Sequence, residues 1–284
     1  MSPTDFPTFG TEHMVYMGVC LAIWLALPFI GKNYLSPSQR IGVALFLAVF
    51  TIFQEVLFDA FQIYIDDFFL KDDLSLHMCG IGLFLTAFAL WKKSQAAFEL
   101  AFFWGLAGAF QSIITPDPAR WPYGDISIFW NFLSHGIIIL NVIWLIWVDG
   151  MRCRKGSLLN TFLITNGVVF VISVVNKILG DGANYWFICA KPGGDNPFLI
   201  GEWPYYLITF ELVGFALMGL IYLPMWYSVH RQEKGGFTLS KTAEVWRRKC
   251  PHYSVTSSSP SAYPLSVPHW NRLYFLSPIL ILVL

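Results

Sequence analysis

Charged side chains are scarce in this chain of 284 residues. Only 13% of its residues are charged, against roughly 25% in an average soluble domain. Disorder requires high charge and low hydrophobicity, and 56% of the chain is apolar, so extensive disorder is excluded. A conventional soluble enzyme is disfavoured, because so few charges cannot keep its surface hydrated. The formal net charge is zero, so no overall attraction to nucleic acid is expected.

Several local motifs are missing as well. The five cysteines contain no Cys-x-x-Cys pair, and their odd number gives no disulfide framework. No dense histidine spacing supports a metal site, and we predict no cofactor. The short alternating segments of a β-barrel are absent. The first apolar run follows acidic residues and precedes no small-residue cleavage site, so it is predicted to be a retained helix and not a signal peptide.

Long apolar runs, in contrast, are abundant. A transmembrane helix needs about 20 mostly apolar residues. The runs that approach or reach this length are residues 14–30, 41–58, 76–91, 96–114, 129–147, 158–179 and 205–225. We therefore predict an all-α membrane protein, a seven-transmembrane helix bundle within residues 1–228. Residues 229–284 are predicted to form a largely disordered cytoplasmic tail, because residues 254–268 are rich in serine and proline.

The distribution of lysine and arginine predicts the orientation of the bundle. Basic residues concentrate in the first, third and fifth connections and in the tail, whereas the opposite connections hold only Lys71, Arg120 and Lys191. Because cytoplasmic loops carry the excess of basic residues, the N-terminus is expected outside and the C-terminus in the cytoplasm. The longest outer connection, residues 180–204, either folds back as a lid or is an ordinary loop.

Polar and ionisable side chains interrupt six of the runs, and each is costly in a bilayer. Because successive spans alternate in direction, all of them fall in the outer half of the membrane. The set comprises His77, Cys79 and His135 together with Glu55, Asp59, Gln111, Asn131, Asn176, Lys177 and Glu211. They form either a structural hydrogen-bond network, worth about 1 kcal/mol per contact, or a functional cavity open to the outer leaflet.

Cys79 is the natural nucleophile of such a cavity, and its thiol needs a base. His77 is two residues away, which on a regular helix turns it to nearly the opposite face. His77 can therefore serve Cys79 only if the helix begins irregularly. His135, from a different span, is the better geometric candidate. Glu55, Asp59 or Glu211 could orient the histidine.

Three motifs, in this order, carry a family resemblance. They are residues 74–79 (LSLHMC), the pair His135-Gly136, and the stretch from residues 184–187 (NYWF) through Lys191 to residues 201–206 (GEWPYY). Together they resemble the bacterial YwaF-type integral membrane proteins over about residues 14 to 228. That family is similar to eukaryotic transmembrane proteins regarded as phospholipid acyltransferases with a cysteine nucleophile.

The resemblance implies a seven-helix protein of the bacterial inner membrane. It also implies that Cys79 carries an acyl thioester, that a histidine activates it, and that the partner is a membrane phospholipid or another acyl lipid. Two alternatives remain open at this point: a transporter or small-ligand-binding membrane protein without catalysis, and a receptor-like or structural bundle. The sequence fixes no oligomeric state.

Overall fold

The computed structural model describes residues 6–116, 126–191 and 200–234. Within these ranges the chain forms seven α-helices and one short 3-10 turn, and contains no strand. The elements are α1 (Thr11–Tyr34), α2 (Pro37–Tyr64), α3 (Met78–Lys92), α4 (Gln95–Ile114), α5 (Ile126–Trp147), α6 (Ser157–Leu179), η1 (Tyr185–Phe187) and α7 (Tyr206–Lys234). The predicted all-α class with seven helices is confirmed.

Six of the seven helices are long and apolar enough to cross a membrane. The exception is α3, which has 15 residues and begins at Met78, two residues later than the predicted run. The predicted third run is therefore two residues too long at its start, and a membrane crossing by α3 stays a prediction. The predicted tail lies outside the described residues from residue 235 onward, and the orientation of the bundle stays a prediction.

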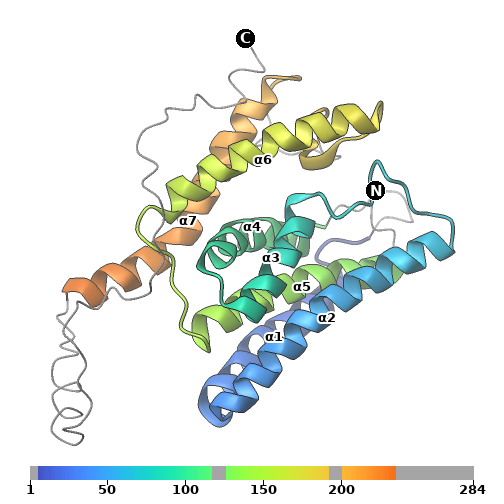
Figure 1. The fold of residues 1–284 in the computed structure, drawn as a ribbon. Helices are drawn as coiled ribbons and strands as arrows, with labels where there is room; N and C mark the ends of the chain where they lie inside the picture. The colour runs from blue at the N-terminus through green and yellow to red at the C-terminus, as the bar shows by residue number, and fades with distance from the viewer. Residues whose placement is uncertain (1–5, 117–125, 192–199, 235–284) are drawn as a thin grey trace, which may run out of the picture.

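The helices form a core of five and a peripheral pair. Helices α1 to α5 pack on one another, with α4 and α5 the most buried. Helices α6 and α7 cross on the α4 side of this core (Figure 1). An aromatic contact between Trp104 of α4 and Trp186 of η1, with ring centroids 5.6 Å apart, joins the core to the segment between α6 and α7.

Glycine lets α3, α4 and α5 approach one another closely. A Cβ atom on Gly105 of α4 would lie 2.7 Å from Cγ2 of Ile138 on α5. On the facing surface, a Cβ atom on Gly82 of α3 would lie 3.9 Å from the Gly105 backbone nitrogen. Small residues at helix contacts are a common packing device in membranes, because little hydrophobic force acts between helices there. These contacts hold the three helices in a defined register.

Candidate functional site

Helix α3 begins inside the bundle. Its first residue follows His77, whose side chain makes no capping hydrogen bond. Cys79, near this start, lies beside Gly108 of α4. Helix α4 continues for six residues beyond Gly108, to Ile114, so about 9 Å of α4 extends past the level of Cys79. The first N–H groups of a helix lack partners within it, and this end carries partial positive charge. The bundle therefore places a region that favours negative charge directly at Cys79. We call this end of the molecule the Cys79 end.

Two glycines make room for this arrangement. A Cβ atom on Gly108 would lie 2.7 Å from Sγ of Cys79, so the sulfur occupies the space that any other residue would fill. A Cβ atom on Gly80 would lie 2.7 Å from the carbonyl oxygen of Ser75, because the chain before α3 folds back against the first turn of the helix. The positions of the thiol and of Ser75 thus both depend on a missing side chain.

The register between α4 and α5 brings His135 to the depth of Cys79. Ser112 of α4 donates a hydrogen bond to Asn131 Oδ1 of α5 at 2.9 Å. The two helices are antiparallel, so Gly108, four residues before Ser112, lies opposite His135, four residues after Asn131. Since Cys79 contacts Gly108, and α3 and α5 also pack directly on each other, the thiol and the imidazole lie at the same level of the bundle.

The hydrogen bond of His135 indicates which of its nitrogens is basic. Nδ1 lies 2.9 Å from the carbonyl oxygen of Asn131, one turn earlier on the same helix. A carbonyl oxygen only accepts hydrogen bonds, so Nδ1 is assigned the proton in this contact. In the neutral ring Nε2 is then the nitrogen that can accept a proton.

Glu55 of α2 supplies a carboxylate at the same depth. Its Oε1 accepts a hydrogen bond from Ser75 Oγ at 2.7 Å, and its Oε2 accepts one from Ser134 Oγ at 3.4 Å. Gln54 Nε2 donates a third, at 3.3 Å. Glu55 therefore ties α2 to the segment before α3 and to the residue next to His135. Asp59 follows one turn later on α2 and is half-buried.

His77 packs against residues 184–189, which we call the overlying segment. Its ring centroid lies 5.0 Å from that of Tyr185 and 5.4 Å from that of Phe187. Trp186 donates its backbone N–H to His77 Nδ1 at 3.4 Å and its indole N–H to the Leu76 carbonyl at 2.7 Å. The helix begins irregularly, as a role for His77 requires, but these contacts direct the ring toward the overlying segment.

The overlying segment is conformationally strained. Trp186 and Phe187 have φ values of 60° and 52°, in the left-handed region that bulky side chains rarely adopt. Asn176 of α6 holds the segment by two hydrogen bonds, one from the Tyr185 N–H at 2.9 Å and one to the Tyr185 carbonyl at 3.0 Å. Of the two interpretations of residues 180–204, the lid describes this part better, since the segment folds back over His77. Residues 192–199 lie outside the described residues.

The other predicted residues divide by location. Asn131 is buried and paired with Ser112, which makes it a link between α4 and α5. Gln111 is exposed and bonds with Thr115 at the end of α4. Lys177 is exposed on α6, and Glu211 is half-buried on α7. The structure thus places Cys79, His135 and Glu55 at a similar depth on packed core helices, whereas Lys177 and Glu211 belong to the peripheral helices.

Sequence reasoning missed a buried network one to two turns deeper. Asn141 of α5 donates hydrogen bonds to the hydroxyls of Thr51 at 2.9 Å and Thr86 at 3.1 Å, and all three residues are fully buried. The hydroxyls of Thr51 and Thr86 in turn donate hydrogen bonds to backbone carbonyls of their own helices. The network joins α2, α3 and α5. An asparagine within an apolar run was the signal that could have identified it.

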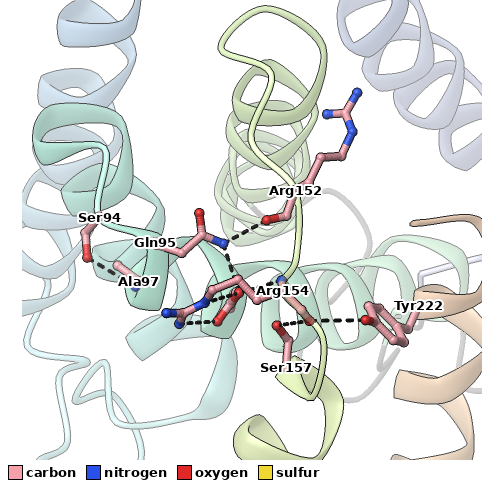
Figure 2. Close-up of polar contacts among 8 residues, drawn as sticks. Ser94, Gln95, Ala97, Arg152, Arg154, Ser157 and Tyr222 are labelled. Carbon is pink, nitrogen blue, oxygen red and sulfur yellow. Dashed lines mark hydrogen bonds and ion pairs between the residues drawn. The ribbon is translucent and has the colours of Figure 1, made fainter. Parts of the chain in front are cut away.

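A second missed cluster lies at the other end of the bundle, around Glu99 of α4. Arg154 donates to both carboxylate oxygens of Glu99, at 3.0 and 2.7 Å, and its backbone N–H donates at 2.8 Å. The Arg154 carbonyl accepts hydrogen bonds from Ser157 and Tyr222 (Figure 2). The hydrogen bonds to Glu99 raise the pKa of Arg154. A lone glutamate within an apolar run marked this position in the sequence.

An open apolar groove of about 610 Å³ runs along α3. Its walls are formed by the segment before the helix and by one helix face. The lining residues are Leu74, Ser75, Leu76, Ile81, Phe84, Leu85 and Phe88. Phe88 follows Cys79 by nine residues, which is two and a half helical turns, so the groove and the thiol face opposite sides of α3. The two meet only at the start of the helix, near Ser75.

These features define a multi-pass membrane protein with a candidate thiol site at the half-buried Cys79, within its helix bundle. Comparison with known families shows that residues 8–222 match the TMEM164 family, and the chain belongs to that eukaryotic family of multi-pass membrane proteins. The resemblance to bacterial YwaF-type proteins is therefore wrong, and the expected location in a bacterial inner membrane loses its support. No curated protein and no solved structure matches the chain.

Proposed function

We propose that this protein is a membrane-embedded lipid acyltransferase that uses Cys79 as its nucleophile and His135 as its general base. The observation that carries the proposal is the common depth of a thiol, an imidazole and a carboxylate on three packed helices, beside the start of α3. Ionisable groups inside a membrane are expensive and usually functional. The apolar groove beside Ser75 supports a lipid as the substrate.

The proposed reaction has two balanced steps. In the first, His135 Nε2 takes the proton of the Cys79 thiol while the sulfur attacks the carbonyl carbon of a lipid ester. The carbon–oxygen bond breaks, the lipid alcohol leaves with the proton from His135, and an acyl thioester remains on Cys79. In the second, an acceptor alcohol gives its proton to His135 and attacks the thioester. The sulfur leaves and recovers a proton. Water as the acceptor makes the same site a hydrolase.

Each chemical requirement of these steps corresponds to a feature of the site. Burial makes a free thiolate costly, so we expect proton transfer to the histidine to accompany the attack. The first N–H groups of α3, which the helix itself provides with no partners, are suited to the oxyanion that forms on the ester carbonyl. The Asn131 carbonyl fixes the tautomer of His135 that leaves Nε2 basic.

A thioester trapping experiment tests the proposal. The full-length protein in lipid nanodiscs is incubated with a phospholipid that carries an alkyne-tagged acyl chain, and the tag is then detected on the protein. We expect a label that neutral hydroxylamine removes and that Cys79→Ala abolishes. Cys189→Ala is the matched control, because that thiol is exposed at the same end of the bundle. An unlabelled wild type, or equal labelling of Cys79→Ala, would refute the covalent mechanism.

A second candidate, a ligand-binding or proton-relay function without catalysis, has one specific observation in its favour. Within the described residues, the buried side-chain oxygens Gln54 Oε1 and Asn141 Oδ1 have no hydrogen-bond partner. Both lie on the inward side of Glu55, where unsatisfied acceptors are costly. Proton flux through proteoliposomes, followed with a pH-sensitive dye, separates the candidates. Flux that Asn141→Leu abolishes, with no thioester on Cys79, would favour the relay.

A further inference from the structure

The apolar groove along α3 has a single polar lining residue, and that residue lies at one end. Ser75 is adjacent to the start of the helix, whereas Ile81, Phe84, Leu85 and Phe88 extend away from it over about 10 Å of helix. Phe84 and Phe88 are 41% and 46% exposed, so the groove opens to the surroundings of the bundle. A groove of this shape has a polar entrance next to the thiol site and an apolar body.

We propose that this groove binds one acyl chain of an esterified membrane lipid, with the ester at Ser75 and the chain extending toward Phe88. This inference rests on the proposed function, because it takes the chain to belong to the substrate. A groove open to the hydrocarbon of a bilayer is filled by lipid chains and not by water. Its volume of about 610 Å³ lies within the range of small-molecule sites.

The charge beside Ser75 selects the chemical form of the ligand. Ser75 donates its hydroxyl proton to the Glu55 carboxylate at 2.7 Å, so a negative charge stands behind the polar end of the groove. A free fatty acid would bring a second carboxylate to this charge, and like charges at short range repel. An uncharged ester avoids that repulsion. The Glu55 carboxylate carries a full negative charge, whereas the start of α3 carries only about half a unit of positive charge. The repulsion therefore prevails at Ser75, and the groove is suited to a chain in ester linkage and discriminates against a free fatty acid.

The length of the groove gives the site a measurable selectivity. Leu85 is half-buried in the wall, and Phe88 is the lining residue furthest along α3 from Ser75. Leu85→Trp shortens the available space, and Phe88→Ala lengthens it. Filling or emptying an apolar site discriminates between chains by modest factors for each methylene. We expect Leu85→Trp to shift the thioester on Cys79 toward shorter chains and Phe88→Ala to shift it toward longer chains.

Photolabelling locates the chain without requiring catalysis. Full-length Cys79→Ala protein in nanodiscs is irradiated with a phosphatidylcholine whose acyl chain carries a diazirine, and the adducts are mapped by mass spectrometry. We expect adducts on residues 81–88 severalfold above those on the exposed face of α2 at Val49 and Phe53. Leu85→Trp should remove most of the groove adducts, whereas Val49→Trp, a matched change on α2, should not. A diazirine fatty acid should label the groove severalfold less.

The outcomes separate the two proposals. Equal labelling of α3 and α2, groove labelling that survives Leu85→Trp, or preferential labelling by the free fatty acid would overturn the groove proposal. If neither Leu85→Trp nor Phe88→Ala changes the lengths of the acyl chains found on Cys79, the groove is not a binding site for the substrate. Absence of a thioester on the wild-type protein removes the proposed function instead, and groove labelling in Cys79→Ala is measured independently of that result.

Discussion

At the scale of single residues, the candidate site depends on a glycine that holds no reactive group. Gly108 leaves the space that Sγ of Cys79 occupies, and a methyl group there would lie 2.7 Å from the sulfur. We expect Gly108→Ala to displace the thiol and to lower the rate of Cys79 acylation at least about tenfold, since small displacements of reacting groups are costly. The rate of thioester formation from the tagged phospholipid measures the effect.

The control for this substitution is Gly167→Ala on α6, where nothing lies within 4 Å of the added carbon. An alanine in an exposed helix stabilises it relative to glycine by roughly 0.5–1 kcal/mol, so this variant should fold at least as well as the wild type. Acylation of Gly108→Ala at the wild-type rate would show that the site tolerates a displaced sulfur, contrary to the proposed geometry.

The two histidines are also distinguished at the residue scale. His135 lies level with Cys79 and has its Nδ1 engaged, whereas His77 packs under Tyr185 and Phe187. We expect His135→Gln to slow acylation about 10²- to 10⁴-fold, the usual contribution of a general base. His77→Gln should slow it much less. Single-turnover rates for both variants at equal protein concentration decide between them, and the reverse order would assign the base to His77.

At the scale of elements, the start of α3 shows what a sequence pattern can and cannot predict. The apolar run predicts that the helix begins at residue 76, whereas it begins at Met78. The helix begins later because Tyr185 accepts the Leu74 N–H and donates to the Leu70 carbonyl, and Trp186 donates to the Leu76 carbonyl. These partners lie more than a hundred residues away in sequence, and local periodicity contains no information about them. The six longer helices were predictable because a bilayer demands continuous apolar length.

The overlying segment is an element whose order depends on Asn176. Removing the Asn176 amide leaves the Tyr185 N–H and carbonyl without their partners, at roughly 1–3 kcal/mol for each buried group. We expect Asn176→Ala to increase hydrogen exchange in residues 183–189 while exchange in α1 stays unchanged. Ser173→Ala is the control, because the Ser173 hydroxyl donates to the Val169 carbonyl of its own helix. Unchanged exchange in Asn176→Ala would show that the aromatic contacts alone hold the segment.

At the scale of the whole molecule, hydropathy predicts which segments cross the membrane but not which helices are neighbours. The sequence prediction used only the depth of each residue in the membrane, and it therefore grouped Lys177 and Glu211 with Cys79. In the structure α6 and α7 lie at the edge of the core, so those two residues belong to different surroundings from the thiol. Glu55 and His135 lie on core helices that pack together, and the structure brings them to the depth of Cys79. Packing order follows from side-chain fit across the bundle, which a single sequence does not display.

An ion pair between Arg154 and Glu99 joins the connection between α5 and α6 to helix α4. The Glu99 side chain is 6% exposed and the Arg154 side chain is 58% exposed, so the two charges have unequal access to water. Removing the arginine side chain leaves a buried carboxylate without its positive partner, although the Gln95 amide and the backbone N–H of residue 154 still donate to it. The cost therefore approaches, at most, the roughly 3–5 kcal/mol of an uncompensated buried charge. Removing the glutamate charge leaves an arginine that water can still solvate, and costs less. The pair therefore predicts an asymmetry in stability.

We expect Arg154→Met to lower the thermal stability of the detergent-solubilised protein by several degrees more than Glu99→Gln does. The double variant should be more stable than the sum of the two single changes predicts, because it contains no uncompensated charge. Lys93→Ala is the matched control, since Lys93 pairs with Asp149 at the same end and its side chain is 40% exposed. The Asp149 side chain is 17% exposed, against 6% for Glu99, so losing the Lys93 charge should cost less than losing the Arg154 charge. Equal losses from Arg154→Met and Glu99→Gln would contradict the buried state of Glu99 on which the asymmetry depends.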